Sequence, residues 1–161
     1  MSDKPHVTRS GGCGNSDMDV TKLPFNHLIG LELGEPGSDF LVSLPDDVKY
    51  TNHLSTVHAS ALFAVAEAAS GLFLLRHFGA DAGLVPVVRR VEIKFRKPGR
   101  GRVSARALVT PDEASHWSEE LARRGRVVAS VPVEVVGSDG QTAVSATIDW
   151  FITRNEAATT E

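Results

Sequence analysis

The sequence has little cysteine, few aromatic residues and no excess of positive charge. Its 161 residues include one cysteine, Cys13, which excludes a disulfide framework and a zinc site built from cysteines, so a cytoplasmic location is expected. Acidic residues outnumber basic ones by 20 to 17, and the net charge of −3 argues against a nucleic-acid binder. Residues 1–20 lack a long apolar stretch, so neither a secretory signal nor a membrane anchor is expected there.

The chain has the length of one domain and is too short for two ordinary ones. Residues 1–20 and 155–161 are polar and are predicted to be disordered tails, which leaves a single domain over 21–154. Within it, six segments alternate apolar and polar residues: 29–34, 40–44, 90–96, 102–109, 127–135 and 144–152. This alternation predicts strands with one buried face, as in antiparallel sheets. Pro132 inside the fifth segment predicts an edge strand or a bulge.

Two helices are predicted between these strands. The first covers about 57–78, and from Val57 to Leu75 it contains no Lys, Arg or Asp and only one Glu. Because it is apolar on every side, we expect it to be buried all round rather than to span a membrane. The second covers 110–124, where Thr110-Pro111-Asp112-Glu113 is typical of a capped helix start. Six strands and one apolar helix predict an α+β fold in which the sheet curls around that helix.

The single acidic residue of the apolar helix, Glu67, is the main functional candidate. Burying an unpaired carboxylate costs several kcal/mol, so Glu67 must be neutralised, paired or open to a cleft. Helical spacing places mostly small or polar residues on its face: Ser60, Phe63, Ala64, Ser70, Gly71 and Leu74. Glu67 is therefore either a base or nucleophile beside a ligand, or a structural carboxylate at a subunit contact.

The segment before this helix suggests a site for a carbonyl group. The first N–H groups of a helix have no partners within it and can polarise a carbonyl, as in an oxyanion hole. Asn52 and His58 could orient a substrate there, or they could be a turn asparagine and a helix-capping histidine. His53, His58 and Glu67 do not have a recognised metal-ligand spacing, so no metal site is expected.

Basic residues concentrate between Arg89 and Arg106, where eight of the 17 are found. They either bind the phosphates of an anionic ligand or form a solvated sheet face. Arg96 and Lys97 are the candidates for binding such a ligand.

The stretch NHLSTVHASALFAVAE, from Asn52 to Glu67, resembles the motif of hotdog-fold thioesterases of the phenylacetic-acid-pathway type. The later RRVEIKFRKPGRGRVSARALV resembles the third strand, hairpin and fourth strand of that family. The resemblance implies a curved antiparallel six-stranded sheet wrapped around one long central helix. It also implies hydrolysis of an acyl-CoA by a homodimer or homotetramer, with coenzyme A as part of the substrate and no separate cofactor.

The same resemblance assigns roles to individual residues. Glu67 is the catalytic carboxylate, the N–H of Ala59 contacts the thioester oxygen, and Asn52 and His58 complete the catalytic set. The family glycines are replaced by Ser55, Ala59 and Ser60. Ser60, Phe63, Ser70 and Gly71 are expected to bind substrate. Two alternatives remain: a hydratase or dehydratase that uses His53 with Glu67, and a non-catalytic acyl-CoA-binding module.

Overall fold

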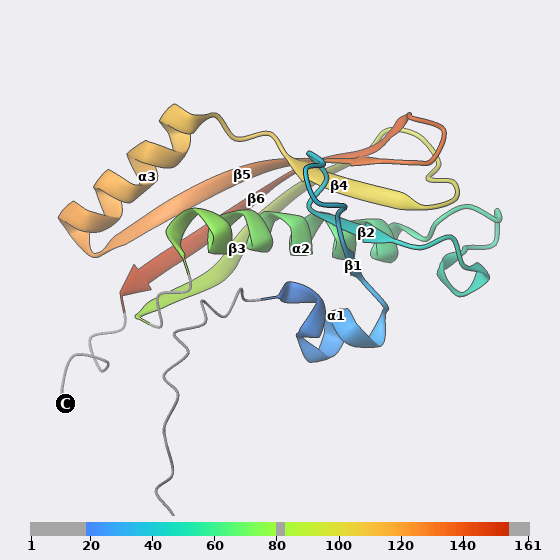
Figure 1. The fold of residues 1–161 in the computed structure, drawn as a ribbon. Helices are drawn as coiled ribbons and strands as arrows, with labels where there is room; N and C mark the ends of the chain where they lie inside the picture. The colour runs from blue at the N-terminus through green and yellow to red at the C-terminus, as the bar shows by residue number, and fades with distance from the viewer. Residues whose placement is uncertain (1–18, 80–82, 155–161) are drawn as a thin grey trace, which may run out of the picture.

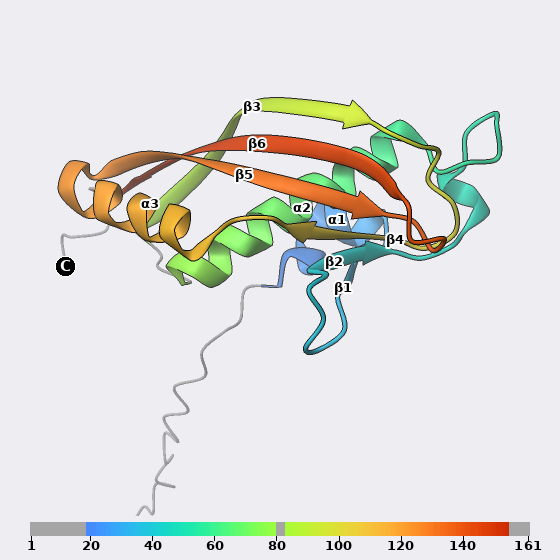
Figure 2. The ribbon, with the colours of Figure 1, turned by 90° about the horizontal axis from the view of Figure 1, so that it is seen from above.

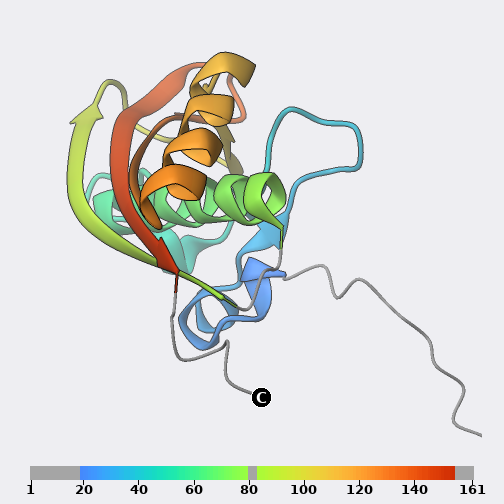
Figure 3. The same cartoon turned by 90° about the vertical axis from the view of Figure 1, so that its left-hand side faces the viewer.

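A computed structural model describes residues 19–79 and 83–154 of the chain; Cys13 and most of the two predicted tails lie outside them. A six-stranded antiparallel sheet curves around the long helix α2 (Figure 1, Figure 3). The strand order is β1-β2-β4-β5-β6-β3. The predicted α+β hotdog arrangement, with one central helix, is confirmed.

The strands differ widely in length. They are β1 (Glu32–Leu33), β2 (Val42–Leu44), β3 (Leu84–Phe95), β4 (Val103–Ala107), β5 (Arg126–Val136) and β6 (Thr142–Arg154). The helices are α1 (Pro24–Leu28), α2 (Ala59–Phe78) and α3 (Pro111–Arg124), with short 3₁₀ turns η1 (Val20–Lys22) and η2 (Val48–Tyr50). Figure 2 shows β3 and β1 at opposite margins of the sheet, so the long strand β3 has one open edge.

Helix α2 packs against β2, β4, β5 and β6 and forms the centre of the core. Its apolar side chains, such as Val65 and Leu72, are buried, although its length and composition alone would also suit a membrane span. The expectation that α2 is buried all round is wrong, because the sheet covers only part of its circumference. Ser60 and Phe63 are exposed, and Glu67 and Gly71 are half-buried.

The predicted alternation is clearest in β5 and β6, where inward residues such as Val131 and Ile148 are fully buried. Pro132, however, lies on an interior strand between β4 and β6 and not at a bulge, so that prediction is wrong. The β4–β5 ladder ends at Ala107 and Val133, and the next backbone N–H, that of Leu108, donates to the Pro132 carbonyl at 2.8 Å. Pro132 therefore lies opposite Leu108, and because proline has no N–H it cannot donate the return hydrogen bond of this pair, so the ladder ends there.

The N-terminal region differs most from the sequence-based prediction. The strand predicted over 29–34 is reduced to Glu32–Leu33, and Ile29 is the C-cap of a short helix, α1, that was not predicted. Pro24 begins this helix, and the buried Asn26 side chain donates to the Val20 carbonyl at 2.9 Å. Proline favours the first helical position because it needs no N–H there, and this was the available signal.

A buried polar contact joins α2 to the sheet. The Trp150 indole N–H on β6 donates to the Ser70 hydroxyl at 2.9 Å, and that hydroxyl donates to the Glu67 carbonyl at 2.7 Å. Ser70 is fully buried and the Trp150 side chain nearly so.

Replacing Ser70 should therefore leave the buried indole N–H without an acceptor. We expect Ser70→Ala to lower the free energy of unfolding by about 1–3 kcal/mol, measured by urea denaturation. The matched control is Ser130→Ala, on the exposed face of β5, which should change it by less than about 0.5 kcal/mol. Equal effects of the two substitutions would contradict a structural role for the Ser70–Trp150 contact.

Candidate functional site

The candidate site begins at the N-terminus of α2, which His58 caps. The His58 Nδ1 atom accepts a hydrogen bond from the Ser60 backbone N–H at 3.1 Å. The His58 backbone N–H in turn donates to the Tyr50 carbonyl at 2.7 Å, which fixes the start of the helix against η2. Of the two roles considered for His58, the structure shows the capping role. Its Nδ1 is occupied by the helix itself.

Asn52 organises the turn that leads into the helix. Its Oδ1 atom accepts from the backbone N–H groups of Leu54 and Thr56 at 2.9 and 3.2 Å, and its Nδ2 donates to the Thr56 hydroxyl at 3.0 Å. Ser55, at the tip of this turn, has a left-handed φ of 56°. This conformation costs a non-glycine residue about 1 kcal/mol and explains why glycine suits the position.

The Asn52 turn and its cap leave two donors free at the start of α2. Among residues 19–79 and 83–154, no group accepts a hydrogen bond from the backbone N–H of Ala59 or of Ala61. Ser60 donates to His58, and Leu62 donates to the His58 carbonyl at 3.0 Å. Free N–H groups at a helix N-terminus carry partial positive charge and can bind an oxyanion.

A surface hollow of about 330 Å³ lies against this end of α2. It brings together four residues that were predicted to act in one site: Asn52, Ala59, Arg96 and Lys97. The rest of its lining comes in equal parts from the end of β3 and the loop that follows it (Phe95, Pro98 and Gly99) and from the start of α2 and the turn before it. The loop at the end of β3 therefore places positive charge beside the first turn of α2.

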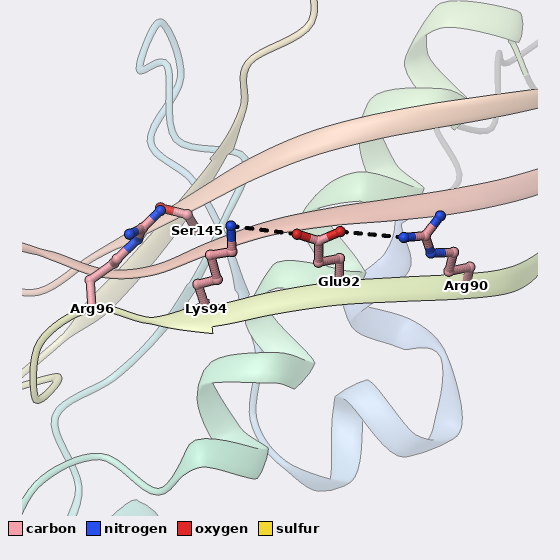
Figure 4. Close-up of polar contacts among 5 residues, drawn as sticks. All are labelled: Arg90, Glu92, Lys94, Arg96 and Ser145. Carbon is pink, nitrogen blue, oxygen red and sulfur yellow. Dashed lines mark hydrogen bonds and ion pairs between the residues drawn. The ribbon is translucent and has the colours of Figure 1, made fainter.

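The basic residues of β3 and β4 do not all contribute to this hollow. On the exposed face of β3, Glu92 lies between Arg90 and Lys94, at 3.4 and 3.6 Å (Figure 4). Two further arginines pair with carboxylates: Arg102 with Glu32, and Arg106 with Glu134. These four charges are largely balanced, as in a solvated sheet face.

Arg96 and Lys97 have neutral partners instead. The Arg96 Nε donates to the Ser145 hydroxyl at 3.4 Å, as Figure 4 shows, and the Lys97 Nζ donates to the Gln141 side-chain oxygen at 2.6 Å. Within the described ranges, neither side chain forms an ion pair with a carboxylate. Their positive charge is thus available to an anionic ligand.

Glu67 lies in the third turn of α2 on its uncovered stripe. Partial burial raises the pKa of the Glu67 carboxyl above its usual range. No cation or hydrogen-bond donor contacts this carboxylate in the described part of the chain, so nothing opposes the effect of burial. A half-buried carboxylate with a raised pKa is a stronger base than an ordinary glutamate.

The other predicted substrate-binding residues separate into two groups. Ser60 and Phe63 lie on the same uncovered stripe as Glu67. Gly71 is half-buried, and a Cβ atom added to it would lie 3.5 Å from the Trp150 ring, so this position faces the sheet. Ser70 is different, because its side chain points into the core and its hydroxyl is occupied by Trp150 and the Glu67 carbonyl. The prediction of Ser70 as a substrate-binding residue is therefore corrected: its role is structural.

His53 and Glu67, the alternative catalytic pair, are not in direct contact in the structure. His53 is exposed in the turn before α2, and no ion pair or hydrogen bond joins it to Glu67. Over residues 19–79 and 83–154, no group of three or more His, Cys, Asp or Glu side chains is arranged to hold a metal ion.

The structure also contains an apolar hollow that the sequence analysis missed. It lies between α1 and α2 and is lined in part by Phe25, Ile29 and Tyr50. Its existence depends on α1, which was not predicted. Pro24 was the only local signal for that helix.

Comparisons with known proteins place this geometry in context. The sequence profile of a family described as "Domain of unknown function (DUF4442)" matches residues 22–152. No curated protein matches the chain.

Solved structures similar to the chain include three from bacteria. A Pseudomonas aeruginosa protein of unknown function, named a "probable thioesterase", has 20% identity and a TM-score of 0.72, covering 84% of this chain and 91% of its own. A Chlorobaculum tepidum protein of unknown function has 20% identity and a TM-score of 0.70, with coverages of 83% and 88%. A Bacillus halodurans protein solved with CoA has 22% identity and a TM-score of 0.52, covering 69% of each chain. These similarities establish the hotdog fold.

The raised pKa of Glu67 predicts how stability depends on pH. At pH values below the ordinary pKa of a glutamate, residue 67 is protonated in both the folded and unfolded states, so its burial does not lower the free energy of unfolding. As pH rises through the raised pKa of the folded state, the partly buried carboxylate ionises and stability is lost. We therefore expect Glu67→Gln to raise the Tm at pH 8 relative to wild type, with little difference at pH 4.

The matched control is Glu119→Gln, on the exposed face of α3. Thermal unfolding of the three proteins at both pH values tests the prediction. A Glu67→Gln variant that is less stable than wild type at pH 8 would show that the carboxylate has a stabilising partner.

Proposed function

The chain belongs to the DUF4442 family, and we propose that it is an acyl-CoA thioesterase that uses Glu67 and the N-terminus of α2. Two features of the same helix support this function together. The N–H groups of Ala59 and Ala61 are free donors, and the Glu67 carboxyl has a raised pKa and no partner among the described residues. Thioester hydrolysis needs both: donors for the negative charge that develops on the carbonyl oxygen, and a base or nucleophile for the carbonyl carbon.

In the proposed reaction the thioester oxygen accepts from the Ala59 N–H. The Glu67 carboxylate takes a proton from a water molecule as the water oxygen attacks the carbonyl carbon. The C–S bond then breaks as Glu67 passes the proton that it accepted to the CoA sulfur, so that CoA leaves as a thiol and the acyl group leaves as a carboxylic acid. Direct attack by the Glu67 carboxylate, with later hydrolysis of the anhydride, gives the same products.

The proposed site requires two copies of the chain. Ala59 and Glu67 are eight residues apart on one helix, which separates their Cα atoms by about 12 Å along the axis. A glutamate side chain covers only part of that distance, whereas reacting groups must lie within about 3.5 Å of one another. Glu67 of one subunit would therefore face Ala59 of a second copy in a homodimer.

The open edge of β3 supports such a dimer. This strand is 12 residues long, pairs only with β6, and exposes Val85 and Val87 to 40% and 51%. A long open edge is normally covered, and pairing with the same strand of a second copy would cover it. Two such dimers could form the tetramer that the family resemblance implies.

Arg96 and Lys97 support coenzyme A as the carrier of the acyl group. Both side chains line the hollow beside Ala59, and no carboxylate of the described residues neutralises them. The phosphates of coenzyme A would find two cations there. The Bacillus halodurans structure, which was solved with CoA, lends support to the same ligand for this fold.

The first test measures thiol release from a panel of acyl-CoAs. We expect Glu67→Gln to lower kcat/KM by about 10²–10⁴-fold, because a general base contributes that much. For wild type, kcat/KM should fall with decreasing pH, beginning above the range of an ordinary glutamate. If no acyl-CoA releases thiol above the Glu67→Gln background, the protein is not a thioesterase.

The second test removes only the proposed oxyanion donor. Proline lacks an N–H and is well accepted at the first helical position, which Ala59 occupies, and His58 before it has an extended backbone that proline tolerates. We expect Ala59→Pro to lower kcat by about 10²–10³-fold while circular dichroism and Tm remain close to wild type. Ala59→Gly keeps the N–H and is the matched control; an equal loss in both variants would exclude the donor role.

A further inference from the structure

An apolar hollow of about 230 Å³ lies on the opposite side of the α2 N-terminus from the hollow beside Arg96 and Lys97. Helix α1 covers the side of α2 that faces away from the sheet (Figure 1, Figure 3), and the hollow lies between them. Its apolar walls are Phe25, Ile29, Leu44, Tyr50, Ala61 and Ala64. Two alanines on the α2 side leave the space that larger side chains would fill.

The wall formed by α1 is held in place by polar contacts outside the hollow. The Tyr50 hydroxyl donates to the Ile29 carbonyl, which ties η2 to the end of α1. Gly30 follows with a φ of 71°, and a Cβ atom there would lie 3.0 Å from the Tyr50 hydroxyl. Together with the Asn26 contact to Val20, these interactions make the hollow part of the folded structure.

The polar residues of the hollow include His58 and Ser60, which belong to the first turn of α2. The apolar hollow therefore opens toward the same turn that presents the Ala59 N–H. On the other side of this turn lie Arg96 and Lys97. A coenzyme A thioester bound at the Ala59 N–H has an anionic part and an acyl group. The hollow lined by Arg96 and Lys97 suits the anionic part, and the apolar hollow suits the acyl group.

We propose that the hollow between α1 and α2 binds the acyl group and selects chains of about six to eight carbons, aliphatic or aryl. This inference rests on the proposed thioesterase function. The size limit follows from volume: an apolar cavity of about 150 Å³ accommodates benzene, so one of 230 Å³ accommodates a ring or chain with one or two further carbons. Phe25 and Ala61 are the residues that set the depth of the hollow.

The test measures binding of two non-hydrolysable thioethers, S-ethyl-CoA and S-octyl-CoA, by calorimetry, so that it does not depend on turnover. For wild type we expect S-octyl-CoA to bind at least tenfold more tightly than S-ethyl-CoA. Ala61→Phe fills the hollow and should remove most of this preference. Phe25→Ala removes one wall and should reduce the preference about fivefold. Phe25→Ala should not change S-ethyl-CoA binding by more than about twofold.

The matched control is Leu28→Ala, on the same helix as Phe25 but 78% exposed and outside the hollow. It should leave the preference unchanged. If Ala61→Phe and Phe25→Ala both retain the wild-type preference, the acyl site lies elsewhere and the inference is overturned, even if thiol release depends on Glu67. If the variants abolish the preference but no acyl-CoA is hydrolysed, the acyl site stands and the proposed reaction fails.

Discussion

The packing of one apolar helix inside a curved sheet determines the properties of the proposed site. The sheet covers the face of α2 that carries residues such as Val65 and Leu72, and leaves an uncovered stripe and a free N-terminus. Burial of most of the helix removes water from around Glu67, which raises the pKa of its carboxyl. The first N–H groups of a helix have no acceptors within it, and those of Ala59 and Ala61 find none elsewhere among the described residues.

The residues around the N-terminus have mainly a positioning function. Asn52 closes the preceding turn, and His58 caps the helix through its Nδ1. Because these side chains satisfy the turn and the second helical N–H, the Ala59 N–H is the donor left over at the first position. The motif formed by Asn52, His58, a small residue and an acid therefore includes residues that build the start of a helix, and not only residues proposed to contact substrate.

Much of this arrangement could be predicted from the sequence, and the failures have physical causes. Period-2 alternation identified β5 and β6, and the capping box identified α3, because both patterns are local. Helical spacing correctly placed Ser60 and Phe63 beside Glu67 but also placed Ser70 there, since periodicity cannot show which flank of a stripe the sheet covers. Helix α1 has only five residues, too few for a periodic pattern, so the apolar hollow that it forms could not be foreseen.

The replacement of glycines in the motif has different consequences at different positions. At position 59 the proposed donor is the backbone N–H, which alanine retains. The Cβ atom of alanine takes up space beside the donor but does not remove it. At position 55 the backbone itself requires a left-handed φ, and Ser55 adopts it at a cost of about 1 kcal/mol. Four hydrogen bonds between Asn52 and the residues that follow it offset that cost and hold the turn closed. The side chain of Asn52 is therefore what allows this chain to keep a helix start of the family type without the glycine.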